Sequence, residues 1–83
     1  MHQFEIRFEA TFSPVALNHN DLKWITSNGY TFEGTNENGY FVYLKTKVME
    51  FPSRHAAERW VDEQNHFSPP TLRIIGCIEK GAD

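Results

Sequence analysis

Several features that usually reveal a protein's chemistry are missing from this chain of 83 residues. A single cysteine, Cys77, excludes an internal disulfide and favours a reducing compartment. No apolar run approaches the roughly 20 residues that span a membrane, and the beginning MHQFEIRFEA lacks the basic start and apolar centre of a signal peptide. We therefore predict a cytoplasmic protein with no membrane segment.

Motifs for catalysis, metals and nucleotides are also lacking. The four histidines lie far apart without a second ligand at the spacing of a zinc site, and the glycines form no phosphate-binding loop. Cys77 lies in the apolar segment IIGCI, where a buried and unreactive thiol is expected. We predict no catalytic residue, no metal and no cofactor, and expect a protein that is not an enzyme.

Basic residues are too few for a large nucleic-acid-binding surface. The chain has 8 Lys and Arg against 11 Asp and Glu, a formal net charge of −3. Proteins that hold nucleic acid through its phosphates carry a basic patch or stripe, so direct nucleic-acid binding is not expected.

Aromatic residues, by contrast, are plentiful. They make up 14% of the chain, and because each ring can bury roughly 150 to 250 Å², a few can build a dense core in a small domain. We predict a single domain over residues 1–83, with a loose tail from about residue 79.

Local patterns predict six elements. Apolar residues at every second position from Phe4 to Phe12 indicate a strand with one solvent-exposed face. The segment SPVAL is expected to form a short helix, and Asn20 to cap a helix over residues 21–28 that ends at Gly29.

The second half of the chain repeats this strand and helix alternation. Two β-rich runs flank Asn38 and Gly39, a strong turn pair, and predict a hairpin. Ser53 is expected to cap the helix RHAAERWVDEQNH, and TLRIIGCI to form the last strand. The resulting order predicts an α+β, ferredoxin-like βαββαβ fold, a four-stranded antiparallel sheet with its helices on one face.

The segment GYFVYLKTK is too apolar for a strand with one wet face. Strand periodicity places Val42 and Leu44 on one face and Phe41 and Tyr43 on the other. If Val42 and Leu44 pack beneath the helix, Phe41 and Tyr43 stand on the open sheet, where a loop, a second copy of the chain or another protein could cover them.

The stretch NGYFVYLKTKVMEFPSRHAAERW resembles the third strand and second helix of RNA-recognition-motif domains. That family stacks RNA bases on exposed aromatic side chains of the central strands. The resemblance implies that Tyr40 or Phe41, together with Tyr43, would contact single-stranded RNA. The basic residue that the family has before the glycine is Asn38 here.

The sequence favours a small non-enzymatic protein-binding module, an inhibitor or adaptor that blocks a site on a larger host or cognate protein. In size and plan it is similar to phage-encoded inhibitors of host defence, such as anti-CRISPR proteins. A nucleic-acid-binding partner would suit an acidic contact surface. The alternatives are an RNA-recognition-motif-like binder of single-stranded RNA and a homodimeric structural module. The expected partner-binding residues are Phe41, Tyr43, Glu58, Asp62 and Glu63.

Overall fold

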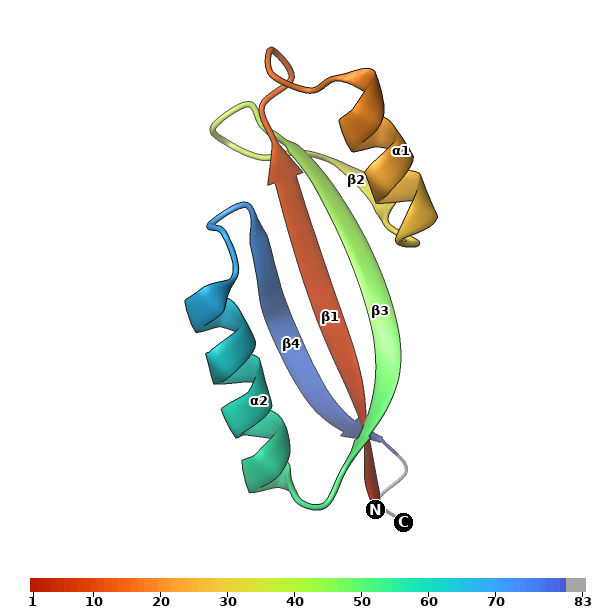
Figure 1. The fold of residues 1–83 in the computed structure, drawn as a ribbon, viewed down its shortest axis with the longest axis vertical. Coiled ribbons are helices and arrows are strands. Elements are labelled where there is room, and N and C mark those ends of the chain that lie inside the picture. The colour runs from red at the N-terminus through yellow and green to blue at the C-terminus, as the bar shows by residue number, and fades with distance from the viewer. Residues whose placement is uncertain (81–83) are drawn as a thin grey trace.

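The first strand, β1 (His2–Phe12), is a central strand of a four-stranded sheet. The computed structural model describes residues 1–80, and in it the strands are ordered β2-β3-β1-β4 with antiparallel pairing throughout (Figure 1). The alternation in β1 has the expected effect. Phe4, Ile6 and Ala10 are fully buried on one face, whereas Glu5, Arg7 and Glu9 point to the other face.

The helix α1 (His19–Ser27) begins after an Asn18 cap, two residues earlier than the sequence predicts. The Asn18 side chain accepts a hydrogen bond from Asp21 N at 2.9 Å, and the Asp21 carboxylate accepts one from Asn18 N. This reciprocal pair is a capping box.

The prediction of a short helix in SPVAL is wrong. Ser13 O accepts hydrogen bonds from both Ala16 N and Leu17 N, which closes a single turn. The turn cannot propagate because Asn18 adopts an extended backbone in order to cap α1.

The hairpin is confirmed, with β2 (Thr31–Thr35) and β3 (Phe41–Phe51) joined by a tight connection. The Asn36 side chain accepts hydrogen bonds from Asn38 N and Tyr40 N. Gly39 has φ +81, a left-handed conformation that glycine adopts without steric cost.

The second helix, α2 (Arg54–Phe67), begins at the predicted Ser53 cap, whose Oγ accepts a hydrogen bond from Ala56 N. The chain then returns as β4 (Leu72–Lys80) along the other side of β1. A loose tail was expected from residue 79, but Glu79 and Lys80 belong to β4 and pair with β1. The rest of that predicted tail, residues 81–83, lies outside the described residues.

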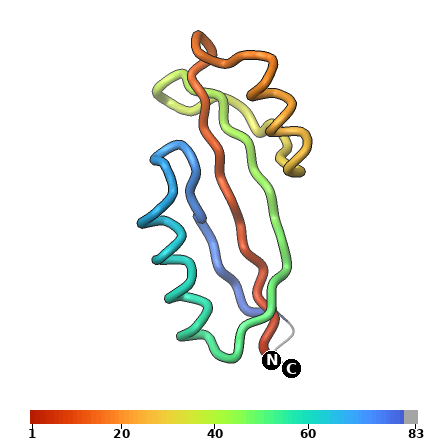
Figure 2. Tube along the Cα trace, viewed as in Figure 1, coloured from red at the N-terminus to blue at the C-terminus, as the bar shows by residue number. Residues whose placement is uncertain are grey.

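Both helices lie on the same face of the sheet but near opposite ends (Figure 2). Under α2, Phe4, Ile6, Ala57 and Ile74 form one buried cluster. A second cluster lies under α1, made of Ala10, Ile25 and Tyr43. The separation elongates the molecule, which measures 44 × 24 × 22 Å. The architecture is the predicted α+β ferredoxin-like fold.

The predicted orientation of β3 is wrong. Tyr43 lies opposite Ala10, and Phe41 opposite Phe12, so both aromatic rings are on the helix-bearing face. Tyr43 is only 8% exposed and packs edge-on against Phe12 and Phe32. Val42 and Leu44 instead lie on the face without helices.

Candidate functional site

The described residues place both helices on one face of the sheet and leave the other face without cover. Across its middle, Glu5 of β1 has Val48 of β3 on one side and Ile78 of β4 on the other. Val48 is 46% exposed and Ile78 is 50% exposed. A carboxylate between two exposed aliphatic side chains therefore forms the centre of this surface, which we call the open face.

Arg7 lies in the next row of the open face, opposite Gly76 of β4. Its aliphatic chain lies over Gly76, where an added Cβ would meet Arg7 Cβ and Cδ at 3.4 Å. Its guanidinium contacts the Glu5 carboxylate at 3.5 Å. Ile75, the extra residue where β4 shifts register opposite Arg7, is also half exposed. Gly76 therefore makes room for the Arg7 chain, which shields the backbone and partly neutralises Glu5.

Charges on the open face are balanced. Strand alternation places three acidic and three basic side chains there, namely Glu5, Glu9, Glu50, Arg7, Arg73 and Lys80. A surface that binds phosphates would show a basic excess. The open face shows no such excess.

The rings that the RNA-recognition-motif resemblance assigned to base stacking are absent from the open face. Tyr43 is buried beneath α1, and Phe41 is half-buried in the same cluster. Tyr40 precedes β3 and is 44% exposed. The stacking platform that the resemblance implies is therefore not formed on the central strands.

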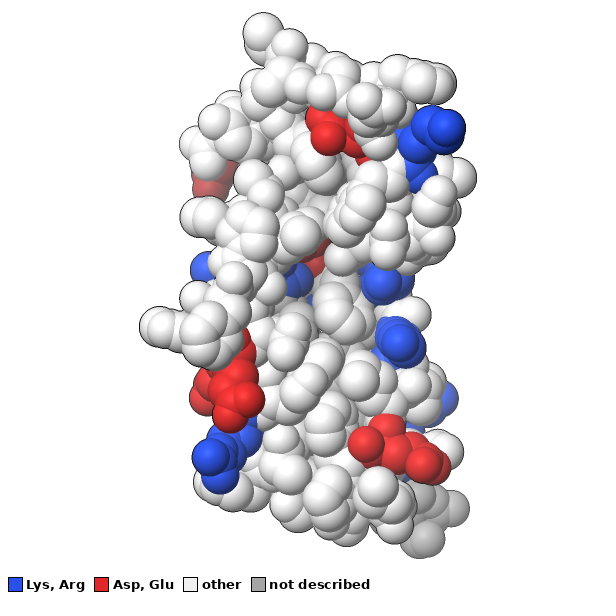
Figure 3. Space-filling model, viewed as in Figure 1, with Lys and Arg blue, Asp and Glu red and all other residues white. Residues whose placement is uncertain are grey.

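The structure separates the five predicted partner-binding residues. Phe41 and Tyr43 belong to the cluster under α1, whereas the three acids project from α2 near the other end of the sheet. Glu58 lies 3.8 Å from Arg54, and Glu63 lies 3.9 Å from Arg59. These exposed pairs contribute little stability. Charges of both signs are visible along the helix in Figure 3. The five residues do not form one patch, and binding by any of them stays a prediction.

On the helix-bearing face, Lys45 lies in the gap between α1 and α2. Its ammonium is 5.0 Å from the centre of the Phe8 ring and 4.9 Å from that of Tyr30. Burial, together with the positive charge of Lys47, holds the pKa of Lys45 below its usual value. Contact with two ring faces partly compensates for the lost hydration of the ammonium.

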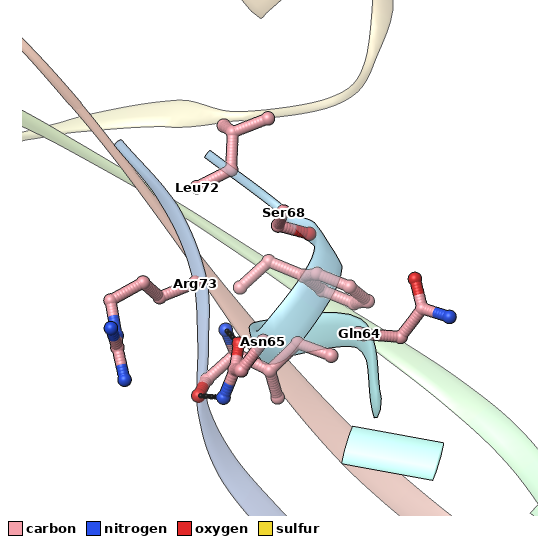
Figure 4. Close-up of a pocket in the computed structure, with 7 residues that line it drawn as sticks. Gln64, Asn65, Ser68, Leu72 and Arg73 are labelled. Atoms are coloured by element: carbon pink, nitrogen blue, oxygen red, sulfur yellow. Dashed lines mark hydrogen bonds between the residues drawn. The ribbon is translucent and has the colours of Figure 1, made fainter. Parts of the chain in front are cut away.

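Shallow hollows lie beside the helices in the described part of the chain. One, of about 170 Å³, lies between α2 and β4 and is lined by Phe8, Leu72 and polar side chains of α2 (Figure 4). Another, of about 160 Å³, lies between Phe12 and Trp24, and a third of about 320 Å³ runs along the outer side of α1. The first two are smaller than the roughly 300 Å³ at which ligand pockets usually begin.

The polar side chain of Asn65, which lines the first hollow, makes two hydrogen bonds. Its amide donates to Ile74 O at 3.0 Å and accepts from Ile74 N at 2.7 Å, as the dashed lines in Figure 4 show. It therefore pairs with the outer edge of β4 as a neighbouring strand would. This amide serves the sheet rather than a ligand.

We expect Asn65→Ala to lower the free energy of unfolding by about 1–3 kcal/mol, because it leaves both partly buried groups of Ile74 without these partners. Urea denaturation followed by circular dichroism measures this change. Gln64→Ala, at an exposed neighbouring position on the same helix, is the control and should change stability by less than about 0.5 kcal/mol. Equal effects of the two substitutions would contradict this role of Asn65.

Within residues 1–80, no group of three His, Cys, Asp or Glu side chains is placed to hold a metal ion. In the same range, neither α1 nor α2 has the length and apolar character to cross a membrane. Cys77 is half-buried against the cluster under α2, and burial raises the pKa of its thiol. A raised pKa reduces the thiolate fraction on which cysteine nucleophilicity depends.

Sequence reasoning missed Val48 and Ile78 as surface residues. A signal was present in β3, because Met49 and Phe51 share the parity of Phe41 and Tyr43 and would have placed all four on the buried face.

Comparison of the chain with protein-family models, curated proteins and solved structures finds no match.

Proposed function

We propose that this protein is a non-enzymatic protein-binding module whose open face covers a site on a larger protein. The supporting observation is the row in which exposed Val48 and Ile78 flank Glu5. Exposed aliphatic side chains gain about 25 cal/mol for each Å² of apolar area that a partner removes from water.

The charges around this row suit a protein partner. Glu5 is already paired with Arg7, so a partner does not have to desolvate an isolated carboxylate, which would be costly. Among the remaining charged groups, Glu50, Arg73 and Lys80 lie on the strands that flank β1, and Glu9 lies on β1 itself. Polar contacts outside an interface core give specificity rather than much affinity.

An inhibitor or adaptor requires only such a folded surface. Action on a host protein, as in phage inhibitors of the anti-CRISPR type, is the most specific form of this proposal. A host or cognate protein with an apolar patch bordered by mixed charges would fit the open face. The acids of α2 remain proposed as a second contact region, directed toward a basic partner.

The test is site-specific photocrosslinking. A photoreactive benzophenone amino acid replaces Ile78 on the open face and, as a matched control, the 96% exposed Val15 in the loop before α1. In the source cell, the variant at position 78 should give one discrete crosslinked protein that the variant at position 15 does not give. Ile78→Asp in purified protein should weaken binding to that partner at least about tenfold, because it places a charge in an apolar contact. Identical crosslinks from both positions, or none from position 78, would overturn the proposal.

A further inference from the structure

The two edges of the sheet differ in whether other parts of the chain pair with their outward backbone groups. At the β4 edge, the Asn65 side chain occupies the outward-facing backbone groups of Ile74. At the other edge, β2 pairs with β3 only from Phe41 to Leu44. β3 continues to Phe51, so among the described residues no strand pairs with residues 45–51 on that side, and we call this stretch the free edge. In Figure 1 no described segment lies beside the outer side of β3 just below α1.

The backbone groups of the free edge can be assigned from the hairpin. Asn36 N donates to Tyr40 O at 2.9 Å, so the carbonyl of Tyr40 points toward the β2 side. Because peptide orientation alternates along a strand and β3 pairs with β1 without a register shift, residues 46, 48 and 50 point the same way. Thr46, Val48 and Glu50 are all exposed. Their N–H and C=O groups are directed to solvent, over a length of roughly 14 Å at about 3.4 Å per residue.

Side chains beside the free edge carry a charge without a counterpart. Lys45 and Lys47 both point to the helix-bearing face, and no ion pair among residues 1–80 includes either. In Figure 3 basic atoms recur along the right-hand margin, where α1 and β3 lie in Figure 1. On the opposite face, Thr46 and Val48 are β-branched and suit an added strand.

We propose that the free edge binds an extended acidic segment of a partner protein, which joins the sheet beside β3 as an added strand. Its main-chain groups would pair with Thr46, Val48 and Glu50, and its carboxylates would lie opposite Lys45 and Lys47. This surface is separate from the open-face row at Ile78, and binding here does not require that row.

The lysines favour an acidic segment over a second copy of this chain. Antiparallel pairing of two free edges centred on Lys47 would place Lys47 directly opposite itself. Centring on Val48 would still leave the two Lys47 side chains diagonal neighbours, at roughly 7–8 Å. Edge lysines of this kind discourage pairing between identical strands. An acidic strand meets no such repulsion.

The test uses two blocked eight-residue peptides, one alternating glutamate with valine and the other alternating lysine with valine. Amide chemical shifts of the whole protein are followed by NMR at low salt. The glutamate peptide should shift the amides of Thr46, Val48 and Glu50. It should also bind at least about tenfold more tightly than the lysine peptide, a preference that weakens as salt is raised.

Two variants separate charge from backbone pairing. Lys47→Glu, at an exposed position, should reverse the peptide preference while leaving the fold unchanged. Val48→Pro should abolish binding, because it removes the outward N–H and leaves the ladder to β1 intact. Val48→Thr keeps that N–H and should bind like the wild type. If Val48→Pro fails to fold, the reversal by Lys47→Glu still decides the matter.

Equal binding of the two peptides, or shifts confined to the hollows beside the helices, would overturn the proposal. Light scattering gives the mass of the protein in solution. A dimer mass for the wild type and Val48→Thr, with a different mass for Lys47→Glu, would assign the free edge to a second copy of the chain and would also overturn the proposal. Peptide binding with no crosslink from position 78 would leave the free edge supported and the open-face proposal refuted. A crosslink from position 78 without peptide binding would support the open-face proposal and refute the free-edge proposal.

Discussion

Phe4→Ala should lower the free energy of unfolding by about 3–5 kcal/mol, which is the usual cost of removing a fully buried phenylalanine ring. Phe4 is 0% exposed and packs edge-on against Phe51, with ring centres 5.9 Å apart. The Phe51 ring in turn packs against the Trp60 ring of α2, with ring centres 5.5 Å apart. Loss of the Phe4 ring therefore leaves a cavity in the contact between β1, β3 and α2.

This loss is large for a domain of 83 residues. At roughly 0.05–0.15 kcal/mol per residue, total stability is on the order of 4–12 kcal/mol. The melting temperature should fall by at least about 12 °C, measured by circular dichroism. Val15→Ala, at the 96% exposed loop position, should leave it nearly unchanged. A fall of only a few degrees in Phe4→Ala would show that this cluster is not the main core.

The fold could be predicted because its determinants are local. Alternation in β1, the Asn38-Gly39 turn and the Ser53 cap each define an element from adjacent residues, and the ferredoxin-like fold follows from their order. Errors occurred where two local signals competed. Ser13 and Pro14 suit the start of a helix, but the Asn18 capping box of α1 requires an extended residue nearby.

The candidate site was harder to predict because it depends on where the helices lie. With Val42 and Leu44 placed beneath the helix, strand alternation predicts Lys45 and Lys47 on the opposite, open face. In the structure α1 and α2 lie near opposite ends (Figure 2), and Lys45 and Lys47 lie on the helix-bearing face. No local pattern encodes this spacing, although the shared parity of Tyr43, Met49 and Phe51 indicates which face of β3 is buried.

The length of β2 was equally inaccessible to pattern reasoning. Hydrophobic periodicity shows that a strand follows Gly29, but it does not show that pairing with β3 stops at Leu44. The free edge exists because Thr31 is the first residue of β2 and the chain before it turns away toward α1. Asn65 was also missed, since an asparagine in an amphipathic helix ordinarily indicates a solvent-facing position.

Neighbouring residues of β3 provide the sharpest test of its orientation. Tyr43→Ala should lower the free energy of unfolding by about 3 kcal/mol or more, because Tyr43 is 8% exposed and its ring packs against Phe12 and Phe32. Leu44→Ala, one residue further on and on the open face, should cost only about 1 kcal/mol, because its side chain is half-buried and no helix packs over it. Urea denaturation of the two variants measures the difference.

The opposite orientation predicts the opposite ranking, since Leu44 would then lie beneath a helix and Tyr43 on the surface. Tyr43→Phe is the control, because it keeps the ring and removes only the hydroxyl, and it should resemble the wild type far more closely than Tyr43→Ala does. Hydrogen exchange adds a second measurement. Tyr43→Ala should speed exchange of the α1 amides, which depend on the cluster with Ile25, more than exchange in α2, whose cluster contains Phe4 and Ile6. Equal acceleration in both helices would show that the two clusters open as one unit, and a larger loss of stability in Leu44→Ala would reverse the assignment of both faces of β3.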